Sequence, residues 1–134
     1  MRRILNSLIF FTFLILFTSC SKDNPEFIVG QWQVIERFDN GNEIDLTQCD
    51  PFIIREFGND GSLRSFIINE NDIPSGVICG ITPSNLFTWE KEDENNYIAR
   101  HSTNALLSIN YRIEGNHLFA RFYPGLFSAT YSRR

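Results

Sequence analysis

The stretch "ALLSINYRIEGNHLFARFYPGLFSATYS" (residues 105–132) alternates apolar and polar side chains along three short runs. Successive side chains of a β-strand point to opposite faces, so this alternation predicts strands with one buried face. In the first run that face consists of Ala105, Leu107, Ile109, Tyr111 and Ile113. "EGN" (114–116) and "PG" (124–125) are turn sequences that suit hairpins. The stretch therefore predicts an antiparallel meander of three strands.

Similar runs recur through the rest of the chain, and turn residues separate them at intervals of about 10 residues. The expected strands lie at 27–38, 52–57, 62–69, 85–92 and 96–102, with a short additional one at 44–46. The segment 70–84 carries two prolines and two glycines and is expected to be a long loop. A sandwich would leave strand edges exposed, whereas consecutive hairpins favour closure. We predict an all-β domain over 27–134, an antiparallel eight-stranded up-and-down barrel.

The first 19 residues have the pattern of a secretory signal peptide. Two arginines follow Met1, an uncharged apolar run covers 4–17, and the small residues Thr18 and Ser19 precede Cys20. The run is shorter than the roughly 20 residues that a membrane-spanning helix needs, although an N-terminal anchor helix is the alternative. "FTSC" resembles a lipobox, the site at which bacterial lipoproteins are acylated on cysteine and cleaved before it.

This resemblance implies lipidation of Cys20 and a polar tether over 20–26. The partner of Cys20 is then a lipid bilayer, in which several acyl chains give stable anchoring. The implied location is the outer membrane, on its periplasmic face or on the cell surface.

Two of the three cysteines remain when Cys20 carries lipid. In an oxidising compartment Cys49 and Cys79 are expected to form a disulfide. Metal binding is a weaker interpretation, because the chain has no Cys-x-x-Cys and its two histidines lie far apart. No metal site and no cofactor are predicted.

Gly30 and Trp32 form a Gly-x-Trp motif at the start of the first expected strand. This resembles the motif that opens the lipocalin barrel, where the indole plugs the closed end and a basic residue packs over it. Arg133 has the best position for that role, ahead of Arg121 and Arg134. The order lipobox, Gly-x-Trp, cysteine, "EFGNDGSL" (56–63), cysteine and "FTWE" (87–90) resembles the small lipocalin-like lipoproteins of Bacteroidetes. The resemblance implies a lipocalin-like, or calycin-like, barrel and no known activity.

Strict alternation places Glu36 on the same face as Trp32, and Arg55 on the same face as Phe57. A lone carboxylate inside a barrel is costly unless it is paired. We hypothesise that Glu36 and Arg55 meet in the interior, as a buried pair or as polar contacts for a ligand. The alternative is that β-bulges turn them outward.

The chain has a formal net charge of −4, and the loss of two N-terminal arginines makes it more acidic. An acidic domain is not expected to bind nucleic acid. No catalytic motif is present, so no enzymatic activity is predicted. The 13 phenylalanines suit a core or a pocket for a small apolar or amphipathic ligand. The alternative is a barrel without a cavity that presents its 70–84 loop to a protein or glycan. We expect a monomer.

Overall fold

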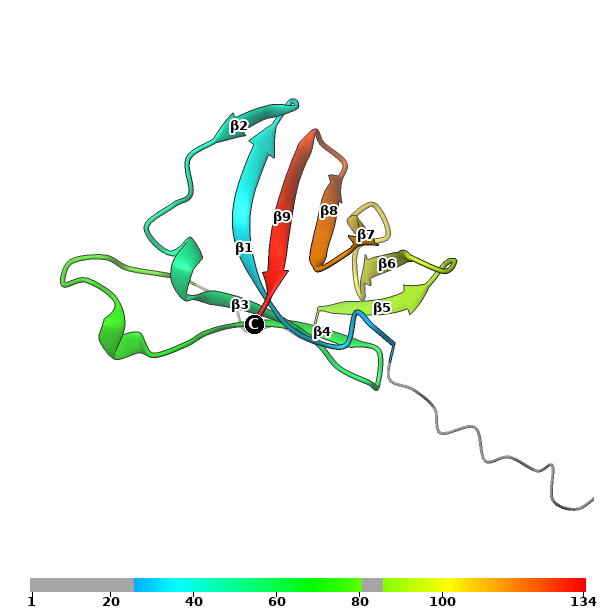
Figure 1. Ribbon diagram of the computed structural model, residues 1–134, viewed down its shortest axis with the longest axis horizontal. Coiled ribbons are helices and arrows are strands. Elements are labelled where there is room, and N and C mark those ends of the chain that lie inside the picture. The colour runs from blue at the N-terminus through cyan, green and yellow to red at the C-terminus, as the bar shows by residue number, and fades with distance from the viewer. Residues whose placement is uncertain (1–25, 81–85) are drawn as a thin grey trace, which may run out of the picture.

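A computed structural model describes residues 26–80 and 86–134 of the chain (Figure 1). Within these residues the fold consists of nine β-strands and two short 3-10 turns, η2 (Asp50–Phe52) and η3 (Glu70–Asp72). The strands are β1 (Gly30–Asp39), β2 (Asn42–Ile44), β3 (Ile53–Phe57), β4 (Ser62–Ile67), β5 (Phe87–Lys91), β6 (Asn96–His101), β7 (Ser108–Glu114), β8 (His117–Tyr123) and β9 (Phe127–Arg133).

The strands form one antiparallel sheet that closes on itself. Their order is β2-β1-β3-β4-β5-β6-β7-β8-β9, and β1 also pairs with β9. Eight strands make the ring, while β2 extends the far end of β1 on the outside. The predicted eight-stranded up-and-down barrel is therefore confirmed. The short additional strand lies at 42–44, slightly before its expected position, because it pairs across the tight turn after β1.

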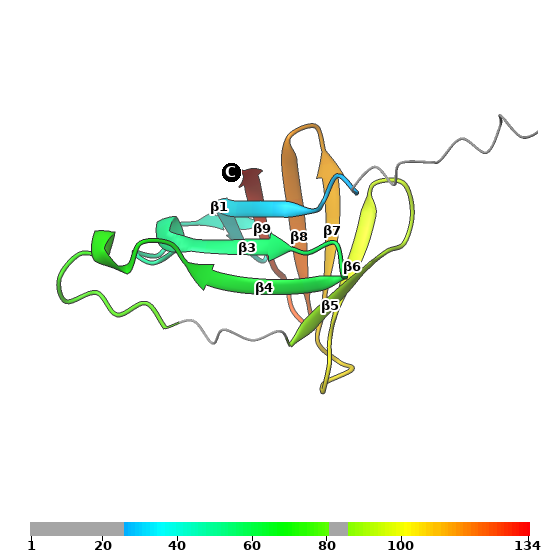
Figure 2. The same cartoon turned by 90° about the horizontal axis from the view of Figure 1, so that it is seen from below.

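The ring is strongly twisted, as small barrels must be. In Figure 2, β1, β3 and β4 run across the direction of β6, β7 and β8. β1 bridges these two walls, since Gly30–Gln33 pair with β3 and the strand from Trp32 onward pairs with β9. A β-bulge interrupts the β1–β9 register between Val34 and Glu36. This bulge changes which side chains of β1 point inward.

One end of the barrel is packed with large side chains. Those with almost no exposure include Trp32, Phe57, Tyr97, Tyr111 and Leu118. Each contributes on the order of 1.5–3 kcal/mol through burial of apolar surface. We call the end that contains Trp32 the closed end and the opposite end the mouth. The mouth is bordered by Phe87, Phe122 and Phe127, which are only partly buried against this core.

A disulfide joins Cys49 to Cys79, with the two Cα atoms 5.4 Å apart. It ties the segment between β2 and β3 to the segment that follows β4. The predicted long loop starts with η3, and its residues 81–84, together with residue 85 of the next expected strand, lie outside the described residues. No helix in the described part of the chain has the length and apolar character to cross a membrane.

Candidate functional site

The closed end is built around Trp32. Its side chain is fully buried, and its indole Nε1 donates a hydrogen bond to the carbonyl oxygen of Ile28 over 2.8 Å. Gly30 has a φ of +131°, and a Cβ there would lie 3.1 Å from Nη1 of Arg133. A side chain at this position would be strained and would crowd the arginine. The glycine thus allows the chain to enter the barrel closely beneath the indole.

Arg133 covers the closed end from outside. Its guanidinium carbon lies 4.8 Å from the ring centroid of Trp32 and 4.6 Å from that of Phe27. Its two terminal nitrogens donate to the carbonyl oxygens of Val29 and Phe27. These contacts fix the chain as it enters β1. The closed end is a plug of packed and hydrogen-bonded groups in which Trp32 is fully buried among the described residues.

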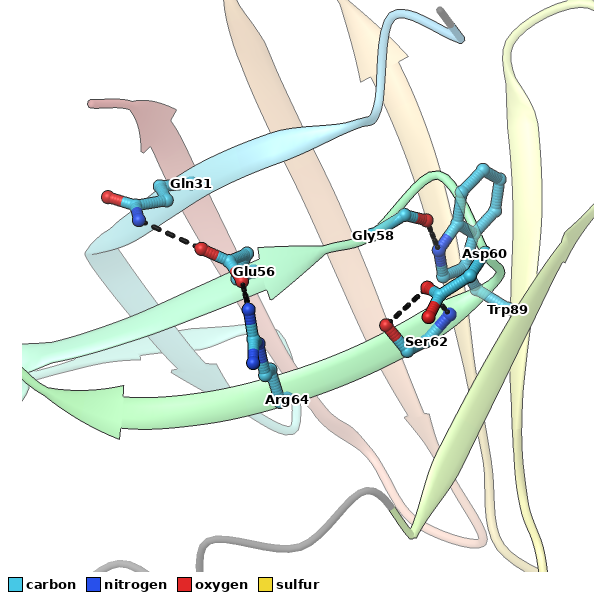
Figure 3. A network of polar contacts seen from close by, with 7 residues as sticks. All are labelled: Gln31, Glu56, Gly58, Asp60, Ser62, Arg64 and Trp89. Carbon is cyan, nitrogen blue, oxygen red and sulfur yellow. Dashed lines mark hydrogen bonds and ion pairs between the residues drawn. The ribbon is translucent and has the colours of Figure 1, made fainter.

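A polar network on the outer face joins β1, β3 and β4 (Figure 3). The carboxylate of Glu56 accepts hydrogen bonds from Gln31 Nε2 over 2.9 Å and from Arg64 Nε over 2.6 Å. These hydrogen bonds, first that of Gln31 and then that of Arg64, lower the pKa of Glu56. Glu56, which lies in "EFGNDGSL", therefore helps to hold β1, β3 and β4 in register.

The turn that follows in the same motif is fixed by its own contacts. Asp60 accepts hydrogen bonds from the backbone N and the hydroxyl of Ser62, and Nε1 of Trp89 donates to the carbonyl of Gly58 over 3.0 Å. The contacts shown in Figure 3 hold the β3–β4 hairpin against β5. The motif is thus structural within the described residues.

Two cavities bordered by described residues lie at the mouth. One has a volume of about 300 Å³ and is bordered by Leu63, Ser65, Phe87 and Leu107, among others. The other has a volume of about 280 Å³ and is bordered by Val34, Phe127 and Tyr131, among others. Arg55 and Phe122 border both, so the two cavities adjoin there. Most of the surrounding groups are apolar or aromatic, which is the usual character of small-molecule sites.

Arg55 lies at the base of the mouth. It is paired in register with Trp32 on β1 and with Ser65 on β4, so its side chain points into the barrel. Its Nη1 donates a hydrogen bond to the hydroxyl oxygen of Tyr111 over 2.7 Å. The guanidinium also lies over the rings of Phe122, at 5.1 Å, and Tyr131, at 5.4 Å. Arg55 therefore separates the packed closed end from the cavities.

The hypothesis that Glu36 pairs with Arg55 inside the barrel is wrong. Glu36 is exposed and lies opposite Thr130 on the outer face. The bulge after Val34 adds one residue to β1 and reverses the alternation, so that Arg37 points inward in place of Glu36. Arg55 does lie inside, as the alternation of β3 predicted.

Arg37 has a partner that sequence reasoning missed. Its Nη1 lies 3.0 Å from Oδ2 of Asp50, which also accepts a hydrogen bond from the backbone N of Thr47 over 2.6 Å. Asp50 is buried, and the guanidinium of Arg37 lies 4.8 Å from the ring centroid of Phe127. The only sequence feature that points to Asp50 is its place directly after Cys49. The disulfide and η2 bring that segment to the rim of the mouth.

A separate groove of about 660 Å³ lies on the outer face of β7, β8 and β9. Its outward-pointing groups include Phe38, Arg112, Phe119, Arg121 and Asp93. The groove is larger than either cavity of the mouth, and its lining mixes both charges with aromatic side chains. Arg112 and Arg121 are exposed and lie over the rings of Phe119 and Tyr123. These features are typical of a solvated surface.

Cys20, the expected signal peptide and the tether up to residue 25 lie outside the described residues. Within the described ranges, no group of three or more histidine, cysteine or acidic side chains is placed to hold a metal ion. No protein-family model matches the chain, and no curated protein matches it in sequence.

Proposed function

We propose that this protein is a lipocalin-like lipoprotein that binds a small apolar or amphipathic molecule in the mouth of its barrel. The observation that carries the proposal is the contrast between the two ends. The closed end is filled around Trp32, whereas the mouth keeps two adjoining cavities of about 300 and 280 Å³. Small-molecule sites start at about 300 Å³, and eight-stranded barrels hold one small ligand.

The character of the walls supports an apolar ligand body. Phe87, Phe122 and Phe127 are inward-pointing but only partly buried, and Leu107, which borders the larger cavity, is exposed. Phe122 and Phe127 pack against each other with ring centroids 5.1 Å apart, and each of the four side chains also borders one of the cavities or both. A ligand that covers them gains roughly 25 cal/mol for each Å² of apolar surface removed from water.

The outer groove is the less suitable site for such a ligand. Its exposed arginines stay hydrated and interact with neighbouring aromatic rings, so an apolar molecule there would displace well-solvated charge. A protein or glycan partner that binds the 70–84 loop is the competing proposal, and the experiment below separates binding in the mouth from binding in the outer groove.

We further propose that acylated Cys20 anchors the domain to the outer membrane. Glu26 and Phe27 lie at the closed end, where Glu26 Oε2 is 2.9 Å from Nζ of Lys91 and Phe27 packs edge-on against Trp32. A tether that joins the domain there leaves the mouth directed away from the bilayer. Replacement of Cys20 by serine should move the protein from the membrane fraction to the soluble fraction. Retention of the Cys20→Ser protein in the membrane would favour an uncleaved anchor helix.

The binding proposal is tested with an uncharged fluorescent dye, N-phenylnaphthylamine, and two matched substitutions. Ser65→Phe places a ring in the mouth, and Ser128→Phe places the same ring in the outer groove. We expect the purified domain to bind the dye, Ser65→Phe to weaken binding strongly, and Ser128→Phe to leave it unchanged. Absence of dye binding, or sensitivity to Ser128→Phe alone, would contradict the proposal.

A further inference from the structure

The mouth carries an uncompensated positive charge. Of the described residues that border its two cavities, Arg37, Arg55 and Asp50 are the charged ones. Asp50 forms an ion pair with Arg37. No carboxylate among residues 26–80 and 86–134 pairs with Arg55, so one positive charge is left at the base of the mouth. Arg55 is half-buried, and a charge that loses part of its hydration is stabilised by an ionic partner.

Arg55 also has unused hydrogen-bond donors. A guanidinium carries five N–H groups, and one hydrogen bond from Arg55, to the Tyr111 hydroxyl, is made within the described part of the chain. The guanidinium carbon lies 5.1 Å from the ring centroid of Phe122 and 5.4 Å from that of Tyr131. Arg55 itself borders both cavities. A planar fork of this kind matches the two oxygens of a carboxylate.

Tyr111 complements this arrangement. Its hydroxyl oxygen accepts the hydrogen bond of Arg55, so the hydroxyl proton is available for a second partner. Burial raises the pKa of Tyr111, against the opposing effect of Arg55, so the proton stays on the hydroxyl at neutral pH. Burial also disfavours the charge of Arg55, but Tyr111 and Tyr131 outweigh it and raise the pKa of Arg55. Arg55 therefore offers a permanent positive charge to the mouth, while Tyr111, which borders neither cavity, orients the guanidinium from the side of the closed end.

We propose that the mouth selects an amphipathic molecule with one negative charge, a carboxylate above all, held by Arg55 while its apolar body lies along Phe122, Phe87 and Leu107. A single net charge in the mouth suits a singly charged head group, because a doubly charged phosphate would bring an unbalanced charge into the barrel. The inference rests on the proposed ligand-binding function and adds the chemistry of the head group.

The test compares decanoate with decanol, which differ in the head group while sharing an apolar chain. Calorimetry or displacement of N-phenylnaphthylamine gives the affinity of each for the purified domain. A charged hydrogen bond that is lost in a buried site weakens binding by about 10- to 100-fold. We expect decanoate to bind more tightly than decanol by a factor in that range. Inorganic phosphate, which has no apolar body, should not displace the dye.

Two substitutions test whether Arg55 and Tyr111 cause the preference for decanoate. Arg55→Met should abolish the preference for decanoate and leave decanol binding intact. Tyr111→Phe removes one oxygen without altering the packing and should reduce the preference severalfold, which keeps the test decisive if Arg55→Met fails to fold. Arg100→Met is the control, because Arg100 is exposed and pairs with Glu90 on the outer face.

The outcomes separate the two proposals. Equal binding of decanoate and decanol by the unsubstituted protein, or an unchanged preference in Tyr111→Phe together with Arg55→Met, would overturn the head-group inference alone. Failure of both compounds and of the dye to bind would overturn the ligand-binding function, and the inference with it.

Discussion

Replacement of Arg133 by methionine should destabilise the domain through the loss of its contacts at the closed end. The cation–π contact with Trp32, at 4.8 Å, is worth about 0.5–2 kcal/mol. The hydrogen bonds to the carbonyls of Val29 and Phe27 come from a charged group, but they are exposed, so solvent reduces their contribution below the usual 1.5–3 kcal/mol. Together we expect a loss of about 1.5–2.5 kcal/mol in the free energy of unfolding.

Urea denaturation of the domain, followed by circular dichroism, measures this loss, and thermal unfolding gives a second readout. For a domain of about 100 residues, the expected decrease in Tm is roughly 5–15 °C. The stability of Arg133→Lys should lie between those of the unsubstituted protein and Arg133→Met. Lysine keeps the charge over the indole but lacks the planar fork that reaches two carbonyls.

The neighbouring Arg134 supplies the matched control. Its backbone N donates to the carbonyl of Gln31, a contact that methionine preserves, and its side chain is exposed. Arg134→Met should change stability by less than about 0.5 kcal/mol. Equal effects of Arg133→Met and Arg134→Met would refute the assignment of Arg133 as the group that closes this end of the barrel.

Three further predictions concern the packing, the disulfide and the pH dependence. Trp32→Ala should cost about 3–5 kcal/mol in denaturant titrations, because the indole is fully buried. Replacement of Cys49 and Cys79 by serine should cost about 3–4 kcal/mol on the loop-entropy estimate, and added reductant should reproduce that loss in the unsubstituted protein. The lowered pKa of Glu56 adds stability that is present above the ordinary glutamate pKa and is lost as the pH falls through the folded-state pKa. Glu56→Gln should therefore flatten the acid side of the stability–pH curve, and an unchanged curve would contradict this prediction.

Much of the fold follows from the sequence because its contacts are local. The run around Tyr111 alternates without interruption, and the residues after it form turns, so the β7–β8–β9 meander needs no information from distant parts of the chain. Closure into a ring follows from the same pattern, since hairpins that continue along a twisted sheet bring β9 to β1.

The candidate site could be predicted from the sequence only in part. The bulge after Val34 is the main reason that the predicted facing of side chains in β1 was wrong. One extra residue reverses the facing of everything that follows in β1, so Arg37 lies inside and Glu36 outside. Alternation alone carries no information about such an insertion. The partner of Arg37, Asp50, lies in a segment without regular strand structure, and only the tertiary fold brings it to the mouth.

The pairing of β1 with β9, which we call the seam, affects the order in which the domain folds. The hairpins β3–β4, β5–β6 and β7–β8 join near neighbours in the chain, whereas the seam joins Trp32 to Arg133. Such long-range contacts form late and slow the folding of β-proteins, because the entropy of closing a long loop is lost before the contacts form. The ring stays open until β9 has paired with β1. Closure of the barrel, and with it formation of the mouth, is therefore expected to follow the formation of the hairpins.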